Sequence, residues 1–197
     1  MRIKPRIHAL SNTTFNDAME NVATATIEPD ILSAEQSPVD MVNADNKETE
    51  YERERGKPMP TKNHGFVQAN LIITLSQRYK QQYRIASEVT IGLLQRYATP
   101  DICLYPYSPM NMRHDEYPVA APPLLVVEIL SPSQSISELL DKAEEYFASG
   151  VQSCWIVQPP LKLVTVLHPN AEPQTFTATI VRDEVMHIEI PFDDIFA

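Results

Sequence analysis

The chain has 197 residues, of which 43% are hydrophobic and 21% are charged, a balance typical of a globular protein with one well-formed core. No apolar run approaches the roughly 20 residues that a membrane-spanning helix needs, and no hydrophobic signal segment follows the basic start, so we expect a cytoplasmic protein with no membrane partner. The net charge is −10 at pH 7, and no cluster of Lys and Arg stands out, which argues against tight, sequence-independent binding to nucleic acid.

The first 46 residues differ from the rest of the chain. They have weak hydrophobic periodicity and many Asn, Asp, Ser and Thr, a composition that predicts a weakly ordered N-terminal arm. A charged connection over residues 47–62 follows. We therefore expect an arm over residues 1–46 and a single domain over residues 47–197.

An amphipathic helix and three strands are predicted in the first half of this domain. Apolar residues recur every fourth position over 63–82, which indicates a helix, and Phe66 widens its apolar stripe. Three apolar runs rich in β-branched residues follow, and they predict strands over 85–93, 101–105 and 124–130. The last two strands are separated by a proline-rich stretch that we expect to be a long loop.

A second helix has a clear start at Ser135, because Glu138 three residues later completes a capping box. Gly150 is a natural end for this helix. Buried strands are then expected over 153–157 and 162–168, followed by a C-terminal hairpin formed by 176–181 and 185–190. This order predicts an α/β (α+β) fold, in which antiparallel strands are flanked by helices.

Two carboxylates interrupt the predicted strands. Glu128 lies inside the apolar run 124–130, and Asp101 opens the run that follows Pro100. Burying an ionised carboxylate is costly unless a charged group compensates for it. If these strands are antiparallel neighbours, Asp101 and Glu128 lie side by side and can share one cation. Two hard oxygen ligands plus water suit Mg²⁺ or Mn²⁺.

Lys142 is the candidate for a positive charge beside this pair. It lies on the second helix, which leaves the same strand as Glu128. A lysine there would hold an attacking water and neutralise the charge that develops on a phosphoryl group. The alternative is a solvated lysine beside Asp141 and Glu145 on the helix surface. Spacing alone leaves both possibilities open.

Several short motifs together resemble one family, although no single motif is specific. They are His64 at the start of the first helix, Pro100-Asp101-Ile102, the run from Val126 to Ser133, Asp141-Lys142, Tyr146, Gly150-Val151 and Trp155-Ile156-Val157. This combination resembles the Uma2 family (DUF820) of restriction-endonuclease-like proteins, within the PD-(D/E)XK nuclease superfamily. The resemblance covers about residues 50–168.

The resemblance implies a restriction-endonuclease-like central mixed sheet flanked by helices, to which this chain adds a C-terminal β-hairpin. It implies hydrolysis of DNA phosphodiester bonds that depends on Mg²⁺ or Mn²⁺. Asp101 and Glu128 would be metal ligands, together with the backbone carbonyl of Ile129. The superfamily places its lysine two residues after the acid, where this chain has Leu130, so the resemblance implies that Lys142 takes over this role.

Three further polar residues are candidates for auxiliary roles. His64 resembles the histidine of the family and would orient a phosphate or a water; the alternative is a hydrogen bond to the backbone at the helix start. Gln68 lies one turn later on the same face, where related nucleases often carry a polar or acidic residue. Glu88 is polar within the strand predicted over 85–93, and it is either an auxiliary ligand or part of an exposed sheet face.

The leading hypothesis is a metal-dependent endonuclease with DNA as its substrate. One alternative is a catalytically silent nuclease-fold protein that acts as a nucleic-acid-binding or protein-interaction module, and the acidic composition favours this alternative. Another is a hydrolase of a different phosphoester on the same fold, because a fold alone does not fix the chemistry. Many relatives of this fold form pairs, so we expect a homodimer.

Overall fold

The computed structural model describes residues 60–197, so the arm predicted over 1–46 and most of the charged connection lie outside the described residues. Helix α2 spans Lys62–Tyr79, which confirms the first predicted helix. Its N-cap is Thr61, whose side chain accepts a hydrogen bond from the His64 N–H at 3.4 Å. The helix ends earlier than predicted, because the chain turns after Tyr79 to enter the first strand.

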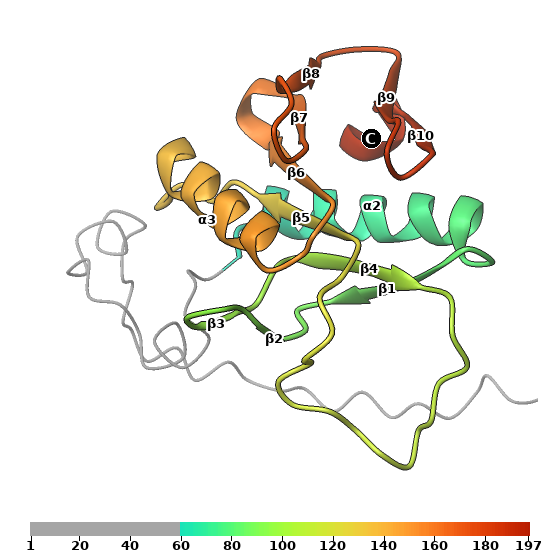
Figure 1. Cartoon of the computed structure of the whole chain (residues 1–197). Helices are drawn as coiled ribbons and strands as arrows, with labels where there is room; N and C mark the ends of the chain where they lie inside the picture. The colour runs from blue at the N-terminus through green and yellow to red at the C-terminus, as the bar shows by residue number, and fades with distance from the viewer. Residues whose placement is uncertain (1–59) are drawn as a thin grey trace, which may run out of the picture. The chain divides into compact units, whose positions relative to one another are not determined.

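A six-stranded mixed sheet forms the centre of the described part (Figure 1), with the strand order β1-β4-β5-β6-β7-β8. Its strands are β1 (Tyr83–Ser87), β4 (Ile102–Pro106), β5 (Leu125–Ile129), β6 (Ser153–Gln158), β7 (Leu163–Leu167) and β8 (Gln174–Phe176). Strands β5 and β6 are parallel and the other neighbours are antiparallel. The mixed sheet is therefore confirmed. The expectation of antiparallel strands holds for every neighbouring pair of this sheet except β5 and β6, which are parallel because a helical crossover returns the chain to the same end of the sheet.

Helix α3, over Ile136–Ala148, provides that crossover. Ser135 and Glu138 form the predicted capping box, in which each side chain accepts a hydrogen bond from the backbone N–H of the other. Gly150 has a φ of 101°, a left-handed conformation that residues with a side chain rarely adopt. The predicted start and end of this helix are both confirmed.

The two faces of the sheet are covered by different elements. One core packs α2, the short helix α4 (Phe192–Phe196) and the C-terminal hairpin against one face, and the other packs α3 and strands β2 and β3 against the opposite face. Figure 1 shows α2 and α3 on either side of β5. Both cysteines, Cys103 and Cys154, are buried free thiols in the α3 core. No helix among residues 60–197 is long and apolar enough to cross a membrane.

The strand predicted over 85–93 is interrupted in the structure. Strand β1 ends at Ser87, and Glu88 has a φ of 58°, so the chain leaves the main sheet at this residue. The continuation, β2 (Ile91–Gly92), pairs instead with β3 (Tyr97–Ala98) in a small separate sheet. The expectation that Glu88 lies on a sheet face is therefore wrong.

The C-terminal hairpin is confirmed, but its strands differ from the prediction. Strand β9 (Ile180–Asp183) pairs with β10 (Ile188–Pro191), whereas β8 belongs to the main sheet. The predicted strand over 176–181 is divided because Thr179 has a φ of 66°. The predicted second strand is shorter at its start, because residues 184–187 form the turn.

Asp183 ties this hairpin to the main sheet. Its carboxylate is buried and accepts hydrogen bonds from the Ser153 hydroxyl at 2.5 Å, the Trp155 indole N–H at 2.7 Å and the Met186 N–H at 2.9 Å. The Ser153 and Trp155 donors bind Oδ2, and the Met186 N–H binds Oδ1, which also lies 3.0 Å from His168 Nε2. A buried charge with this many donors is compensated within the protein.

We predict that Asp183→Ala destabilises the domain by about 3 kcal/mol, because it leaves several buried donors without an acceptor. Urea denaturation followed by tryptophan fluorescence measures this change, since Trp155 is the only tryptophan in the chain. Glu184→Ala is the matched control, because the Glu184 side chain is exposed. Equal stability of the two variants would contradict the prediction.

Candidate active site

The two predicted acids come together at one end of the sheet. Strands β4 and β5 are antiparallel, and Ile102 pairs with Val127. Continuing this register by one residue places Asp101 opposite Glu128. Both side chains are only 2% exposed. The sequence pattern therefore identified two buried carboxylates on neighbouring strands.

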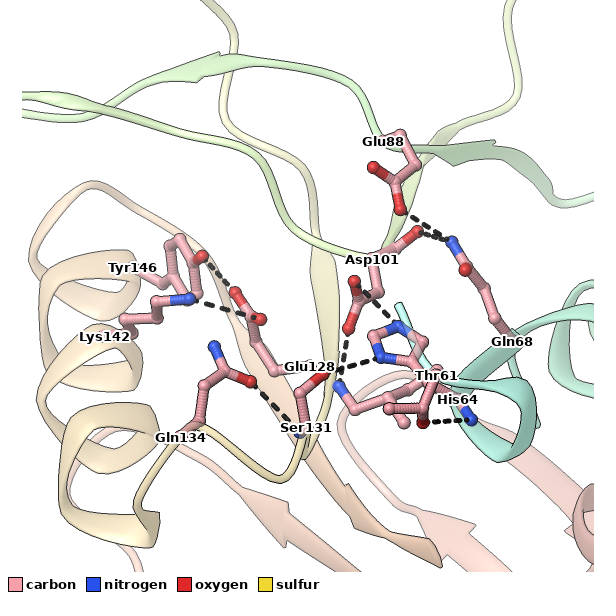
Figure 2. Close-up of polar contacts among 11 residues, drawn as sticks. Thr61, His64, Gln68, Glu88, Asp101, Glu128, Ser131, Gln134, Lys142 and Tyr146 are labelled. Atoms are coloured by element: carbon pink, nitrogen blue, oxygen red, sulfur yellow. Dashed lines mark hydrogen bonds and ion pairs between the residues drawn. The ribbon is translucent and has the colours of Figure 1, made fainter. Parts of the chain in front are cut away.

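Glu128 is held by two side chains from α3 (Figure 2). The Tyr146 hydroxyl donates a hydrogen bond to Glu128 Oε1 at 2.5 Å, and Lys142 Nζ lies 3.5 Å from Glu128 Oε2. Residues four apart on a helix lie on the same face, so both side chains reach the same carboxylate. Glu145, the surface partner considered for this lysine, pairs instead with Arg96.

Asp101 is held from the other side of the sheet. Its Oδ2 accepts a hydrogen bond from the Ile129 N–H at 2.7 Å, and His64 Nε2 lies 3.2 Å from Oδ1. The second ring nitrogen of His64, Nδ1, lies 3.0 Å from the Ser131 hydroxyl oxygen. Because His64 is in the first turn of α2 and is buried, it links this helix to the ends of β4 and β5.

Gln68 and Glu88 meet next to Asp101. The Gln68 side-chain amide donates hydrogen bonds to the Asp101 carbonyl at 2.9 Å and to Glu88 Oε1 at 3.3 Å. The Glu88 N–H donates to the same Asp101 carbonyl at 3.3 Å. The left-handed turn at Glu88 thus brings its carboxylate to the site, although it removes Glu88 from the strand.

The two acids receive their contacts from opposite faces of the sheet. Figure 2 shows the Glu128 carboxylate turned toward Lys142 and Tyr146 of α3 and the Asp101 carboxylate turned toward His64. The Ile129 N–H donates to the same Asp101 carboxylate. Asp101 can make these contacts because it precedes β4, where the strand no longer fixes the direction of its side chain. The site therefore spans the end of the sheet between the two helices.

Burial controls the protonation of two groups near Glu128. Burial, and then the charge and the hydrogen bond of Glu128, raise the pKa of Tyr146 well above its ordinary value. Burial also raises the pKa of the Cys154 thiol; the charge of Glu128 adds to this effect and that of Lys142 opposes it. Tyr146 is therefore a neutral donor and Cys154 a neutral thiol across the physiological pH range.

Asp101 and Glu128 were expected to lie side by side on one cation, but their carboxylates are turned toward opposite faces of the sheet. The oxygens present are of the kind that hard divalent cations bind. Asp101 and Glu128 supply carboxylate oxygens and Ile129 has a backbone carbonyl, and each carboxylate oxygen has a second lone pair beyond the contact described above. Among residues 60–197, no group of three or more His, Cys, Asp and Glu side chains is placed to hold a metal. Mg²⁺ does not require such a group, because it keeps several waters and is usually bound through one or two carboxylates.

The sequence did not predict the contacts of Ser131 and Tyr146 at the site. The contact of Tyr146 could have been predicted from the sequence, because Tyr146 lies one helical turn after Lys142 and shares its face. Ser131 had none, since its contact with His64 joins residues that are 67 positions apart. The predicted site residues fall into two groups at this end of the sheet. Lys142 contacts Glu128. The other group is held together around Asp101 by contacts with His64, Gln68, Glu88 and the Ile129 backbone.

This arrangement belongs to a known class of fold. A crystal structure described as that of "a putative nuclease belonging to DUF820 from Anabaena variabilis ATCC 29413" has a TM-score of 0.62 to this chain and 22% sequence identity. The similarity covers 71% of this chain and 83% of the other. It shows that the chain has the nuclease-type α+β fold that the sequence predicted. None of the curated proteins compared with this chain matches it.

The chain belongs to the Uma2 family. Residues 34–192 match the model of this family, which is described as "Putative restriction endonuclease". The match extends beyond residues 50–168, which carried the resemblance. It also begins within the arm predicted over 1–46, so the domain boundary at residue 46 stays a prediction.

The neutral state of Tyr146 leads to a prediction about alkaline pH. The unfolded chain loses the tyrosine proton near pH 10, whereas the folded protein keeps it, so the unfolded state binds fewer protons and stability falls above pH 10. Tyr146→Phe should reduce this slope by an amount that approaches about 1.4 kcal/mol per pH unit. Part of the slope should remain, because burial also raises the pKa values of Tyr83 and Tyr105.

Urea denaturation at several pH values between 9 and 11 measures this slope. Tyr117→Phe is the control, because the Tyr117 side chain is 82% exposed and should leave the slope unchanged. If Tyr146→Phe and wild type lost stability in parallel, the Tyr146 hydroxyl would not be held neutral by the fold.

Proposed function

We propose that this protein is an endonuclease that hydrolyses DNA phosphodiester bonds with the help of Mg²⁺ or Mn²⁺. The observation that most supports this proposal is the contact between Lys142 and Glu128. It places a positive charge beside a buried carboxylate at the sheet end where Asp101 also lies. The superfamily has its lysine on the strand, at the position of Leu130 here, and a lysine on α3 reaches the same carboxylate from another direction.

Asp101, Glu128 and the Ile129 carbonyl would hold the metal ion. When bound, such an ion lowers the pKa of a water and stabilises negative charge on a phosphoryl group. Lys142 would hold the attacking water and stabilise the charge on the phosphate. The side chain of Lys142 is 19% exposed, whereas that of Glu128 is 2% exposed, so the ammonium group lies between the buried acid and solvent.

The other residues would position these groups. Tyr146 fixes one oxygen of Glu128, and the Ile129 N–H fixes one oxygen of Asp101. His64, in contact with both Asp101 and Ser131, would orient Asp101 and a bound phosphate or water. Gln68 and Glu88 would have auxiliary roles, because both donate hydrogen bonds to the backbone carbonyl of Asp101 and so hold its main chain in place.

A second candidate function is a catalytically silent module that binds nucleic acid or protein. It is favoured by the contacts of the two acids, since each carboxylate oxygen of Asp101 and Glu128 already contacts a protein group. These contacts compensate the buried charges without a metal ion. In a silent protein they would be permanent, whereas in an active enzyme a metal ion would share or replace them.

The proposed activity predicts metal-dependent nicking of supercoiled plasmid. Wild-type protein should convert the plasmid to the open circular form with Mn²⁺ or Mg²⁺ and not with EDTA, and Asp101→Asn should abolish this conversion. Asp115→Asn is the control, because Asp115 is an exposed loop residue. Nicking by Asp101→Asn at the wild-type rate would move the chemistry elsewhere. Hydrolysis of bis(p-nitrophenyl) phosphate without plasmid cleavage would indicate a different phosphoester substrate.

Lys142 should be required for the rate of cleavage rather than for metal binding. We expect Lys142→Gln to lower the cleavage rate at saturating Mn²⁺ by about 100-fold or more, because a preorganised positive group at the reacting phosphate is lost. Mn²⁺ binding, measured by electron paramagnetic resonance, should persist in this variant. Lys80→Gln, at the far end of α2, is the matched control. Equal rates for the two variants would assign Lys142 a purely structural role.

A further inference from the structure

One large apolar side chain lies in an unexpected place. Phe66 was predicted to widen the buried stripe of the first helix, yet its side chain is 58% exposed. Lys62, one turn earlier on α2, has its ammonium group 5.6 Å from the centre of the Phe66 ring. The ring is therefore presented to solvent beside a positive charge, an arrangement that suits a flat, negatively charged ligand.

Phe66 also lines a hollow of about 190 Å³ between α2 and the short 3-10 helix η1 (Pro159–Leu161) and α4. Its polar and aromatic walls are Asn63, Phe66, Asn70, Lys162 and Phe196. Ala197 also lines the hollow, and its terminal carboxylate accepts a hydrogen bond from the Asn70 side chain at 3.3 Å. Lys162 follows η1 directly and has a φ of 46°, so the end of this turn directs the backbone back into β7. No Asp or Glu side chain in the described part of the chain lines the hollow.

The two lysines at this hollow are among the basic residues of the described part that form no ion pair, as are Lys80, Arg84 and Arg113. Arg78, Arg96, Lys142 and Arg182 are each in an ion pair with a carboxylate. Within residues 60–197, Lys62 and Lys162 have no carboxylate partner. In a chain with a net charge of −10, the two lysines give this hollow a local excess of positive charge, which the terminal carboxylate of Ala197 offsets only in part.

The hollow lies at the same end of α2 as the candidate active site. His64, which contacts Asp101, belongs to the same helical turn as Lys62 and Asn63. The buried side of this turn faces Asp101, and its outer side carries Lys62 and Phe66. The first turn of α2 therefore separates the hollow from the candidate active site.

We propose that Lys62, Phe66 and Lys162 form a binding subsite for single-stranded DNA next to the active site. The two lysines contact phosphates, and a base stacks on the Phe66 ring. Stacking on an exposed aromatic ring requires an unpaired base, which is why the ligand is a single strand rather than an intact duplex. This inference rests on the proposed nuclease function for the choice of nucleic acid as the ligand.

Fluorescence anisotropy with a 12-nucleotide labelled oligo(dT) tests the subsite, using the full chain in EDTA so that no cleavage occurs. Phe66→Ala should weaken binding by about five- to 100-fold, because stacking of a base on an aromatic ring is lost. Ile73→Ala is the matched control, since Ile73 is 53% exposed on the same helix and away from the hollow. It should bind as wild type does.

The lysines are tested by the salt dependence of the same binding. Each of Lys62→Gln and Lys162→Gln should reduce the slope of log K against log salt concentration by about 0.7, the value for one phosphate contact to a single strand. Lys80→Gln should leave the slope unchanged, because Lys80 is at the opposite end of α2.

The inference would be overturned if wild type did not bind oligo(dT), or if Phe66→Ala and Ile73→Ala bound it with equal affinity. It would also be overturned if Phe66→Ala lost self-association while its binding of oligo(dT) stayed intact. The last result would make the hollow an interface between copies of this chain. The inference and the nuclease proposal fail separately. If wild type nicks no plasmid but binds oligo(dT) through Phe66, only the nuclease proposal fails; if it nicks plasmid and Phe66→Ala binds normally, only the subsite fails.

Discussion

The hydrogen bond from the Ile129 N–H to Asp101 Oδ2 is the interaction on which the candidate site depends. The paired residues of β4 and β5 end at Ile102 and Val127, and beyond them the Asp101 side chain takes the place of a strand neighbour. Because a side chain takes the place of a ladder hydrogen bond here, the regular pairing of β4 and β5 stops at Ile102 and Val127. Side chains from α2 and α3 then contact the two acids at this end of the sheet. The hydrogen bond to Asp101 also fixes the Ile129 backbone, whose carbonyl is the proposed third metal ligand. Loss of Asp101 would therefore disturb both a ligand and the geometry of its neighbour.

Glu128 shows how a buried charge determines the position of a helix. Lys142 and Tyr146 reach its two oxygens from consecutive turns of α3, so the rotation of this helix about its axis is set by one carboxylate. The capping box at Ser135 and the left-handed Gly150 fix the two ends of the same helix. Between these points, the apolar face of α3 packs on Val126 and Cys154. The contacts of Lys142 and Tyr146 with Glu128 therefore couple the candidate site to the second core.

The sequence predicted the features that depend on local pattern. Helices α2 and α3, the capping box, the buried strands and the acids Asp101 and Glu128 follow from periodicity, capping residues and the cost of a charge in an apolar run. The features that it missed depend on contacts between distant residues. Glu88 leaves its strand because its backbone and side chain meet Asp101 and Gln68, and Asp183 collects donors from residues up to 30 positions away. Phe66 is exposed because η1 and α4 leave a hollow beside this part of α2 and do not cover the ring. No periodicity in the local sequence carries this information.

The charge distribution places a constraint on how such a protein can bind DNA. A net charge of −10 repels a phosphate backbone at long range, so binding cannot depend on a broad basic surface of the kind that gives many DNA-binding proteins their affinity. For the proposed nuclease, what remains is short-range recognition: a metal ion that Asp101 and Glu128 would hold, Lys142 beside it, and the proposed subsite of Lys62, Phe66 and Lys162. Short-range contacts of this kind are strongest where bases are unstacked and the backbone is flexible enough to follow the protein surface. The acidic composition, which at first argues against a nuclease, thus agrees with one that acts on distorted or single-stranded DNA rather than along an intact duplex.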